Sequence, residues 1–195
     1  AAWDDLKFDE KDFLGAVGLS LPAGEKGRRP LEMIWSRPTC EVNGMTSGYT
    51  GDGFKTVLPS KASAKISFRL VGTQDPLKIR EDFRKLVSAM VPADCTVTFK
   101  DHGAGPAGQM STEDPAFAKA RSALTDEFEK TAAYVGCGGS IPIAGYFKTI
   151  LGMDAMLIGF GKDDDQIHSP NEKYDLSSFH KGTRSWARIL HNLTK

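Results

Sequence analysis

His168 is the residue in this sequence whose type and setting most favour catalysis or metal binding. It follows a short apolar run, residues 155–160, whose length and flanking glycines indicate a buried strand. Ligands bind beyond the carboxyl ends of strands in open α/β sheets, so a histidine in the next loop is a candidate metal ligand or acid–base group. We expect Glu172 or an aspartate to hold the second ring nitrogen, because metal-bound imidazoles need such a partner. The alternative is an inert, solvated loop histidine.

Three aspartates, Asp163 to Asp165, precede this histidine. Such a run binds a hard cation only if the loop folds back, and a solvated acidic loop is the simpler interpretation. A catalytic zinc needs about three protein ligands and an open position, and a two-metal site needs more. The sequence has no H-E-x-x-H motif and no second histidine near His168. The residues present therefore do not make a complete metal site.

Gly139 and Ser140 lie between a predicted strand and a predicted helix. Backbone N–H groups and a hydroxyl at the positive end of a helix can bind a carboxylate or an oxyanion. The alternative is a tight turn with Ser140 as the helix N-cap. The surrounding sequence is neither a Walker loop, which requires Gly-Lys-Ser/Thr, nor a nucleophile elbow, which requires Gly-x-Ser-x-Gly.

Three further polar residues are candidates for substrate contacts. Arg69 lies on the polar face of an alternating strand, residues 61–71, and its planar fork suits bidentate contact with a carboxylate, although an ordinary surface arginine is the more common outcome. His102 falls in a glycine-rich stretch and is otherwise a mobile loop histidine. Thr56 is most simply a β-branched strand former.

The composition excludes several classes of protein. The 195 residues contain 25 Lys plus Arg and 25 Asp plus Glu, so no basic excess indicates a nucleic-acid or membrane-surface partner. No apolar run reaches bilayer-spanning length. The cysteines, Cys40, Cys95 and Cys137, are odd in number and form no C-x-x-C motif, which argues against a disulfide framework and favours a soluble protein of the reducing cytoplasm. The first residue is Ala1, which indicates a processed or truncated product.

The hydrophobic pattern predicts an α/β protein with two domains. Apolar spacing and Asp-Pro starts predict helices at residues 8–17, 76–90, 116–130, up to 151 and 176–193, with one helical turn at 31–35. Alternation predicts strands from Thr39, with a turn at Asn43-Gly44, and at 61–71, 95–99, 133–135 and 155–160. We expect an antiparallel sheet with helices on one face in residues 1–108, and part of a parallel α/β domain in 109–195.

Four motifs together resemble one enzyme family. They are Tyr49-Thr-Gly-Asp-Gly-Phe-Lys-Thr-Val-Leu-Pro59, Lys65-Ile-Ser-Phe-Arg-Leu70, Gly138-Gly-Ser-Ile-Pro142 and His168-Ser-Pro-Asn-Glu-Lys173. In this order and spacing they are similar to the two-metal dipeptidases related to carnosinase and the cytosolic non-specific dipeptidase. Complete members are roughly twice as long, so the resemblance implies the later part of a lid (dimerisation) domain, followed by the closing segment of the catalytic domain.

The resemblance also implies a role for each candidate residue. His168 becomes the last ligand of a site for two zinc or manganese ions, and Arg69, His102, Ser140 and its neighbour Gly139 hold the carboxyl end and carbonyl of a dipeptide. Thr56 reaches the partner subunit of a homodimer formed through the lid. The bridging aspartate, the other ligands and the general base belong to preceding sequence in this family, so the resemblance implies that the 195 residues alone carry no catalytic residue and are inactive.

One position departs from the family pattern. The family usually has Arg-Glu before Gly-Gly-Ser, whereas this chain has Gly136-Cys137. Losing that charge weakens or redirects recognition of the substrate's amino end, and Cys137 itself is a candidate metal ligand. The alternatives to a dipeptidase are an N-acyl amino acid deacylase or desuccinylase of the same fold, and a non-catalytic dimerisation module.

Overall fold

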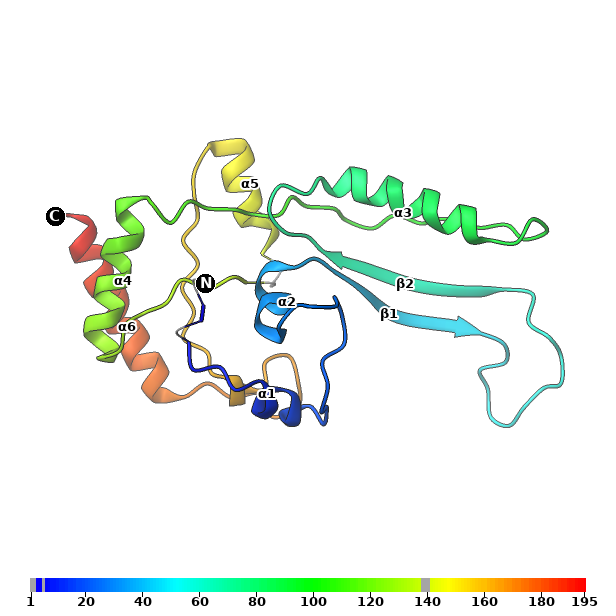
Figure 1. Cartoon of the computed structure of the whole chain (residues 1–195), viewed down its shortest axis with the longest axis horizontal. Coiled ribbons are helices and arrows are strands. Elements are labelled where there is room, and N and C mark those ends of the chain that lie inside the picture. Colours follow the sequence, from blue (N-terminus) through cyan, green and yellow to red (C-terminus); the bar gives the residue numbers. More distant parts are fainter. Residues whose placement is uncertain (1–2, 5, 138–140) are drawn as a thin grey trace. The chain divides into compact units, whose positions relative to one another are not determined.

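The computed structural model describes residues 3–4, 6–137 and 141–195. The chain forms two compact units, Ala1–Gln109 with Gly136–Leu151, and Met110–Val135 with Gly152–Lys195. Figure 1 follows the elements along the chain. In order they are α1 (Glu10–Ala16), α2 (Pro30–Ser36), β1 (Thr39–Ser47), β2 (Ala62–Arg69), α3 (Pro76–Met90), α4 (Pro115–Phe128), α5 (Pro142–Leu151), the 3-10 turn η1 (Asp163–Asp165) and α6 (Leu176–Leu193).

Two short helices open the first unit. The carboxylate of Asp9 caps α1 by accepting the backbone N–H groups of Lys11 at 2.8 Å and Asp12 at 3.1 Å, which satisfies two donors that a helix start leaves open. In α2, Pro30 occupies the first turn, where its missing N–H costs nothing. The carboxylate of Glu32 accepts the N–H of Arg29 at 3.0 Å. Local capping thus accounts for both helices, and α2 extends past the single turn predicted for it.

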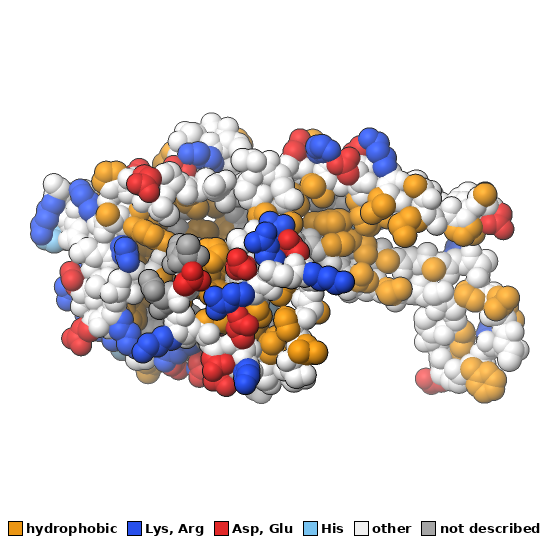
Figure 2. All heavy atoms as spheres, in the orientation of Figure 1, with side chains coloured by type: hydrophobic (Ala, Val, Ile, Leu, Met, Phe, Trp, Pro, Cys, Tyr) orange, Lys and Arg blue, Asp and Glu red, His pale blue; other side chains and the backbone are white. Residues whose placement is uncertain are grey.

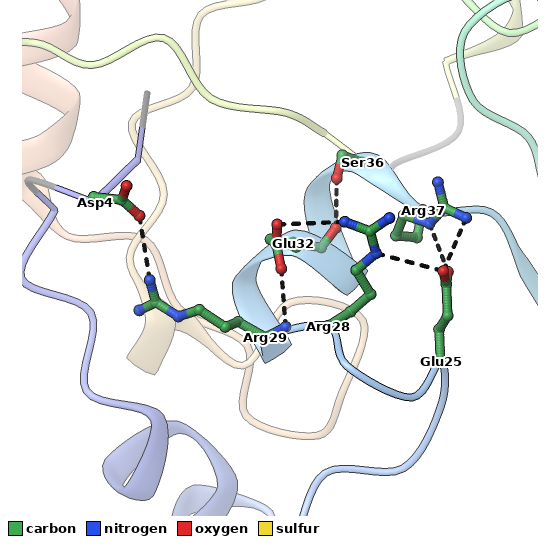
Figure 3. A network of polar contacts seen from close by, with 7 residues as sticks. All are labelled: Asp4, Glu25, Arg28, Arg29, Glu32, Ser36 and Arg37. Atoms are coloured by element: carbon green, nitrogen blue, oxygen red, sulfur yellow. Dashed lines mark hydrogen bonds and ion pairs between the residues drawn. The ribbon is translucent and has the colours of Figure 1, made fainter. Parts of the chain in front are cut away.

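Ion pairs surround α2, as Figure 3 shows. The carboxylate of Glu25 binds Arg37 at 2.6 Å and Arg28 at 3.4 Å, and Arg29 reaches Asp4 at 3.4 Å. The hydrogen bond from Arg37 lowers the pKa of Glu25 below its ordinary value. All these side chains are well exposed, so each pair contributes little to stability.

The strands β1 and β2 form an antiparallel pair with Thr39 opposite Arg69 and Val42 opposite Ile66. The register shifts between Val42 and Gly44, so Asn43 is the extra residue of a β-bulge. The predicted turn at Asn43-Gly44 is therefore wrong: a Gly after Asn suits a bulge as well as a turn, and β1 continues to Ser47.

The apolar face of β2 is covered only toward its C-terminal end. Ile66 and Phe68 are half-buried, whereas Ala62 and Ala64 are exposed. The ring of Phe68 meets that of Phe83 in α3 edge-to-face, with centroids 5.1 Å apart. Figure 1 shows α3 running along the hairpin, and Figure 2 shows hydrophobic side chains between them. The alternation predicted the face correctly but not the extent of its burial.

The second unit is built on α4 and α6. Its buried apolar residues are Ala120, Ala123 and Ile189, and Leu124, Met156 and Ile158 pack against them. At the end of α4, the side chain of Glu127 is only 5% exposed and accepts hydrogen bonds from Arg184 and Arg188 of α6. Small residues let these two helices approach closely, and the charged contacts fix their register.

Three predicted strands are absent from the described structure. Residues 95–99, 133–135 and 155–160 have no regular secondary structure, and the only ladder among the described residues joins β1 to β2. A strand needs a neighbour to satisfy its backbone groups. In residues 155–160, Met156 and Ile158 instead pack against α4 and α6. The apolar pattern of this run therefore reflects packing on helices and not pairing in a sheet. The mixed α/β class itself is confirmed, as are the five longest predicted helical segments. None of the described helices is long and apolar enough to cross a bilayer.

Candidate functional site

Residues 162–175, called the His168 loop below, connect Phe160 and Gly161 to α6. At its start the carboxylate of Asp165 is 1% exposed, although it belongs to a run of three aspartates. Its Oδ2 accepts the backbone N–H of Lys162 at 2.7 Å, and its Oδ1 accepts Nζ of Lys173 at 2.9 Å. The prediction of a solvated acidic run is therefore wrong for Asp165, because a local turn and a lysine eight residues later together satisfy the carboxylate.

The ammonium of Lys173 contacts two further carboxylates, Asp164 at 3.1 Å and Asp175 at 3.3 Å. Lys162 also donates to Asp175. These five residues, called the ion cluster below, combine two positive and three negative charges. The backbone N–H of Lys173 additionally donates to the carbonyl of Asp165 at 3.0 Å, which closes the loop with a main-chain bond beside the ion pair.

The pKa shifts in the ion cluster agree with this geometry. The hydrogen bond from the Lys162 backbone, followed by that from Lys173, lowers the pKa of Asp165 below its usual value. The bond from Lys162 lowers the pKa of Asp175 in the same way. The bond to Asp165 is the main cause that raises the pKa of Lys173. All three groups stay charged near neutral pH, so the cluster persists there.

His168 lies inside the closed loop and is exposed. Its φ of 62° is left-handed, as are those of Gln166 at 53° and Asn171 at 63°. Non-glycine residues adopt this conformation uncommonly, and Asn and His do so more often than most. The carboxylate of Glu172 accepts the backbone N–H of His168 at 3.4 Å. Glu172 makes this backbone contact, and no hydrogen bond of the His168 ring is found among the described residues, so the expected hold of Glu172 or an aspartate on the second ring nitrogen stays a prediction.

An imidazole on a loop fits a divalent metal by donor chemistry, since neutral His nitrogen is a common ligand of zinc. Among residues 3–4, 6–137 and 141–195, however, no three His, Cys, Asp or Glu side chains gather closely enough to hold an ion. The described residues thus bring no set of ligands together around His168, and the remaining donors of such a site would have to come from elsewhere.

Arg69 ends β2 and lies in the first unit. Its guanidinium Nε is 3.6 Å from the carboxylate of Glu41 on β1, and its side chain is 49% exposed. Glu41 also accepts hydrogen bonds from Thr39 and Ser67. The carboxylate therefore orients the arginine along the hairpin, while half of the side chain stays open to solvent.

Two other predicted substrate residues, His102 and Thr56, lie in irregular segments. His102 is exposed, and its carbonyl accepts a hydrogen bond from Arg80 of α3 at 3.4 Å. Thr56 is exposed in the loop between β1 and β2. Gly139 and Ser140 lie outside the described residues. Arg69, His102 and Thr56 all belong to the first unit, whereas His168 belongs to the second.

Gly136, next to the exposed Cys137, approaches the backbone of Trp35 closely. A Cβ at Gly136 would lie 2.1 Å from the carbonyl oxygen of Trp35 and 2.8 Å from its Cβ. Real Cβ atoms do not tolerate such distances, so only glycine fits without rearrangement. The backbone of Trp35 therefore leaves no room at position 136 for the arginine that the family usually has there.

Sequence reasoning missed Lys173 and Asp165 as structural partners of the His168 loop. The signal was available in part, because an acidic run and a lysine flank the histidine. The pattern could not show which of the three aspartates is buried. That depends on the left-handed residues between the aspartates and Lys173.

The structure thus combines a mixed α/β fold with an exposed histidine on a loop that ion pairs close. Histidine is a residue type that commonly binds metal ions. The chain belongs to Peptidase family M20/M25/M40, whose model matches residues 11–192. The predicted relation to dipeptidases of the carnosinase group is thereby confirmed.

Named relatives support the same placement. The Cys-Gly metallodipeptidase dug1 of Schizosaccharomyces pombe is 27% identical over 195 residues, which cover 98% of this chain and 41% of the relative. The Beta-Ala-His dipeptidase of Homo sapiens is 26% identical over 161 residues, covering 80% of this chain and 32% of the relative. The crystal structure of an M20 family metallo-carboxypeptidase, Sso-CP2 from Sulfolobus solfataricus, matches with a TM-score of 0.81 and 27% identity, covering 95% of this chain and 42% of that one. The chain thus spans about one third to two fifths of the length of these relatives.

Proposed function

We propose that this chain is part of a metal-dependent dipeptidase in which His168 supplies one ligand to a site for two zinc or manganese ions. The observation that carries the proposal is the family match across residues 11–192, which includes the closed loop around His168. We further propose that the other ligands and the general base come from polypeptide outside these 195 residues, because the relatives are more than twice as long.

The residues of this chain would bind and orient the substrate. The guanidinium of Arg69, which lies 3.6 Å from the carboxylate of Glu41, has the planar geometry that suits the terminal carboxylate of a dipeptide. His102 and Ser140, with the N–H of Gly139, would hold the carbonyl side. When bound, a divalent metal supplies Lewis-acid polarisation of the scissile carbonyl. Positioning by these side chains would lower the entropic cost of reaching the transition state.

Substitution at His168 tests the proposal. In the protein that carries this chain, we expect His168→Ala to lose bound metal and to lower kcat/KM for Cys-Gly and β-Ala-His by more than about 100-fold, because a direct ligand matters more than the outer partners that cost 10–100-fold. His191→Ala, exposed on α6, is the matched control. Full metal content and activity in His168→Ala would contradict the proposal. Cleavage of N-acetyl or N-succinyl amino acids in place of dipeptides would favour the deacylase alternative.

A specific surface supports dimerisation through the first unit. The loop between β1 and β2 exposes Phe54 by 88%, Val57 by 77% and Leu58 by 92%. Figure 2 shows hydrophobic side chains gathered over the part of the chain that Figure 1 draws as the loop between β1 and β2. Clustered exposed apolar side chains of this kind mark interaction sites. We propose that this loop, with Thr56 in it, contacts a second copy of the protein.

The domain assignment follows from the same family relation. We propose that residues 1–108 form the lid and 109–195 the closing part of the catalytic domain. The boundary between the two compact units falls at Gln109/Met110, which supports this division, although residues 136–151 pack with the first unit. The exposed thiols of Cys40 and Cys95 suit the reducing cytoplasm that we propose as the location.

A further inference from the structure

The His168 loop contains a buried carboxylate whose role the proposed function leaves open. Asp165 is 1% exposed, and each of its oxygens has one strong donor, the Lys162 backbone at 2.7 Å and Lys173 Nζ at 2.9 Å. A buried carboxylate is tolerated only when it is paired and hydrogen-bonded. Here the pairing group comes from the far end of the loop, so satisfying Asp165 requires the loop to close.

The ammonium of Lys173 contacts three carboxylates. Its Nζ lies 2.9 Å from Asp165, 3.1 Å from Asp164 and 3.3 Å from Asp175. Asp164 and Asp165 lie at the start of the loop and Asp175 at its end. One side chain therefore joins both ends, beside the main-chain bond from Lys173 N–H to the Asp165 carbonyl.

Three residues enclosed by this closure have a left-handed backbone, which is uncommon for residues other than glycine. Gln166, His168 and Asn171 all have φ between 53° and 63°. Further local bonds support the turn, from the N–H and hydroxyl of Ser169 to the Gln166 carbonyl at 3.0 and 2.9 Å. Left-handed non-glycine residues persist where the surrounding structure over-determines them. The closure made by Lys173 is the contact that supplies this constraint at the loop ends.

We propose that Lys173 is a positioning residue for His168: its ammonium, seated on buried Asp165, fixes the His168 loop so that the imidazole is presented to a divalent cation before the cation arrives. The proposal deepens the proposed function and rests on it, since it takes His168 to be a metal ligand. It assigns Asp165 the role of anchor and Asp164 and Asp175 the role of secondary partners. Lys173 touches neither the metal nor the substrate.

Two measurements on Lys173→Met test the proposal. In the metal-free 195-residue chain, hydrogen exchange of residues 166–172 should become at least tenfold faster, while exchange in α4 and α6 stays unchanged. In the protein that carries this chain, the affinity for zinc, measured by chelator competition, should fall by about 10–100-fold, the range typical of residues that orient a ligand. Lys173→Arg should retain most of both properties, because a guanidinium can bridge the same carboxylates.

Lys85→Met is the matched control, because Lys85 makes only an exposed pair with Glu81 one helical turn away. It should behave like the wild type in both measurements. Loop exchange within twofold of wild type in Lys173→Met would overturn the proposal, and so would faster exchange with unchanged zinc affinity.

A second variant covers the case in which Lys173→Met unfolds the second unit, which faster exchange throughout α4 and α6 would reveal. Asp164→Asn removes one exposed partner of Lys173 and leaves buried Asp165 intact. Its loop exchange should then rise by a smaller factor with α4 and α6 unchanged, and an unaltered loop would overturn the proposal. Zinc affinity in His168→Ala distinguishes failure of the proposed function from failure of the positioning role. An unchanged zinc affinity in His168→Ala overturns the proposed function. If His168→Ala loses zinc affinity while Lys173→Met keeps it, only the positioning role of Lys173 is overturned.

Discussion

Nη2 of Arg84 lies 2.7 Å from both carboxylate oxygens of Asp101, so the middle of α3 is tied to the residue that precedes His102. Arg80, one turn earlier, adds a contact of 3.5 Å to the same carboxylate and donates to the carbonyl of His102 at 3.4 Å. The position of His102 therefore depends on α3, although His102 itself lies in an irregular segment.

Arg84→Met should loosen this segment. The side chains of Arg84 and Asp101 are 34% and 41% exposed, so the free energy of unfolding should fall by only about 0.5 kcal/mol, as for exposed pairs. Hydrogen exchange of residues 99–103 should nevertheless accelerate. If His102 orients substrate, KM for a dipeptide should rise while kcat changes less. Lys85→Met serves as control, and unchanged exchange at 99–103 would contradict the role of Arg84.

Ile189→Ala should destabilise the second unit strongly. Ile189 is 2% exposed and packs against Ala120 and Ala123, so its truncation leaves a cavity that costs about 2–5 kcal/mol. Urea unfolding followed by circular dichroism measures the change. Leu190→Ala, at a neighbouring position that is 61% exposed, should cost less than about 0.5 kcal/mol. Equal losses in the two variants would show that α6 does not pack as described.

Gly136→Ala should cost about 1–3 kcal/mol, the usual range for forcing atoms into filled space, because the new Cβ would meet the Trp35 carbonyl. Gly136→Arg, which introduces the family's usual residue, should be at least as damaging. Gly103→Ala is the control, since a Cβ there meets nothing within 4 Å. Thermal unfolding compares the three variants. A stable Gly136→Ala protein would mean that the 136–137 segment sits elsewhere.

Glu127 should contribute to the acid sensitivity of the second unit. The hydrogen bond from Arg184 is the largest cause that lowers the pKa of Glu127 below its ordinary 4.5, and Arg188 adds to it. A lowered pKa stabilises the fold above the unfolded value, and this stabilisation is lost as the pH falls through the folded value. The difference in Tm between wild type and Glu127→Gln should thus be largest near neutral pH and shrink below about pH 4.

Other carboxylates also become protonated in this acidic pH range. The measurement therefore compares the Tm of the wild type with that of Glu127→Gln at each pH. Glu113→Gln, exposed before α4, serves as the control for replacing a carboxylate outside the contact between α4 and α6. A Glu127→Gln protein whose deficit stays constant down to pH 2 would refute the pairing with α6.

The helices could be predicted from local chemistry. Asp75-Pro76 and Asp114-Pro115 place a capping carboxylate before a proline, and both carboxylates accept the expected backbone N–H groups at 2.8 Å. Such signals lie within a few residues of one another, so they need no tertiary information. The same holds for the apolar face of β2, whose alternation follows from strand geometry alone.

Features that depend on distant partners could not be predicted. The apolar run 155–160 fits a strand or a segment packed on helices equally well, and only contact with Ile189 decides between them. Likewise the sequence placed His168 in a loop but did not reveal that Lys173 and Asp165 close it. Nor could the sequence show that the carboxylate of Glu172 accepts the backbone N–H of His168 within the turn.

The chain passes between its two compact units at Gln109/Met110, Val135/Gly136 and Leu151/Gly152. Neither unit can be released by a single proteolytic cut, since a nick at any one crossing leaves the other two connections intact. During synthesis α4 must also wait for α6, made more than sixty residues later, before Ala123 finds Ile189. Truncations for crystallisation should therefore keep residues 110–195 together with residues 1–109, because residues 136–151 belong to the first unit.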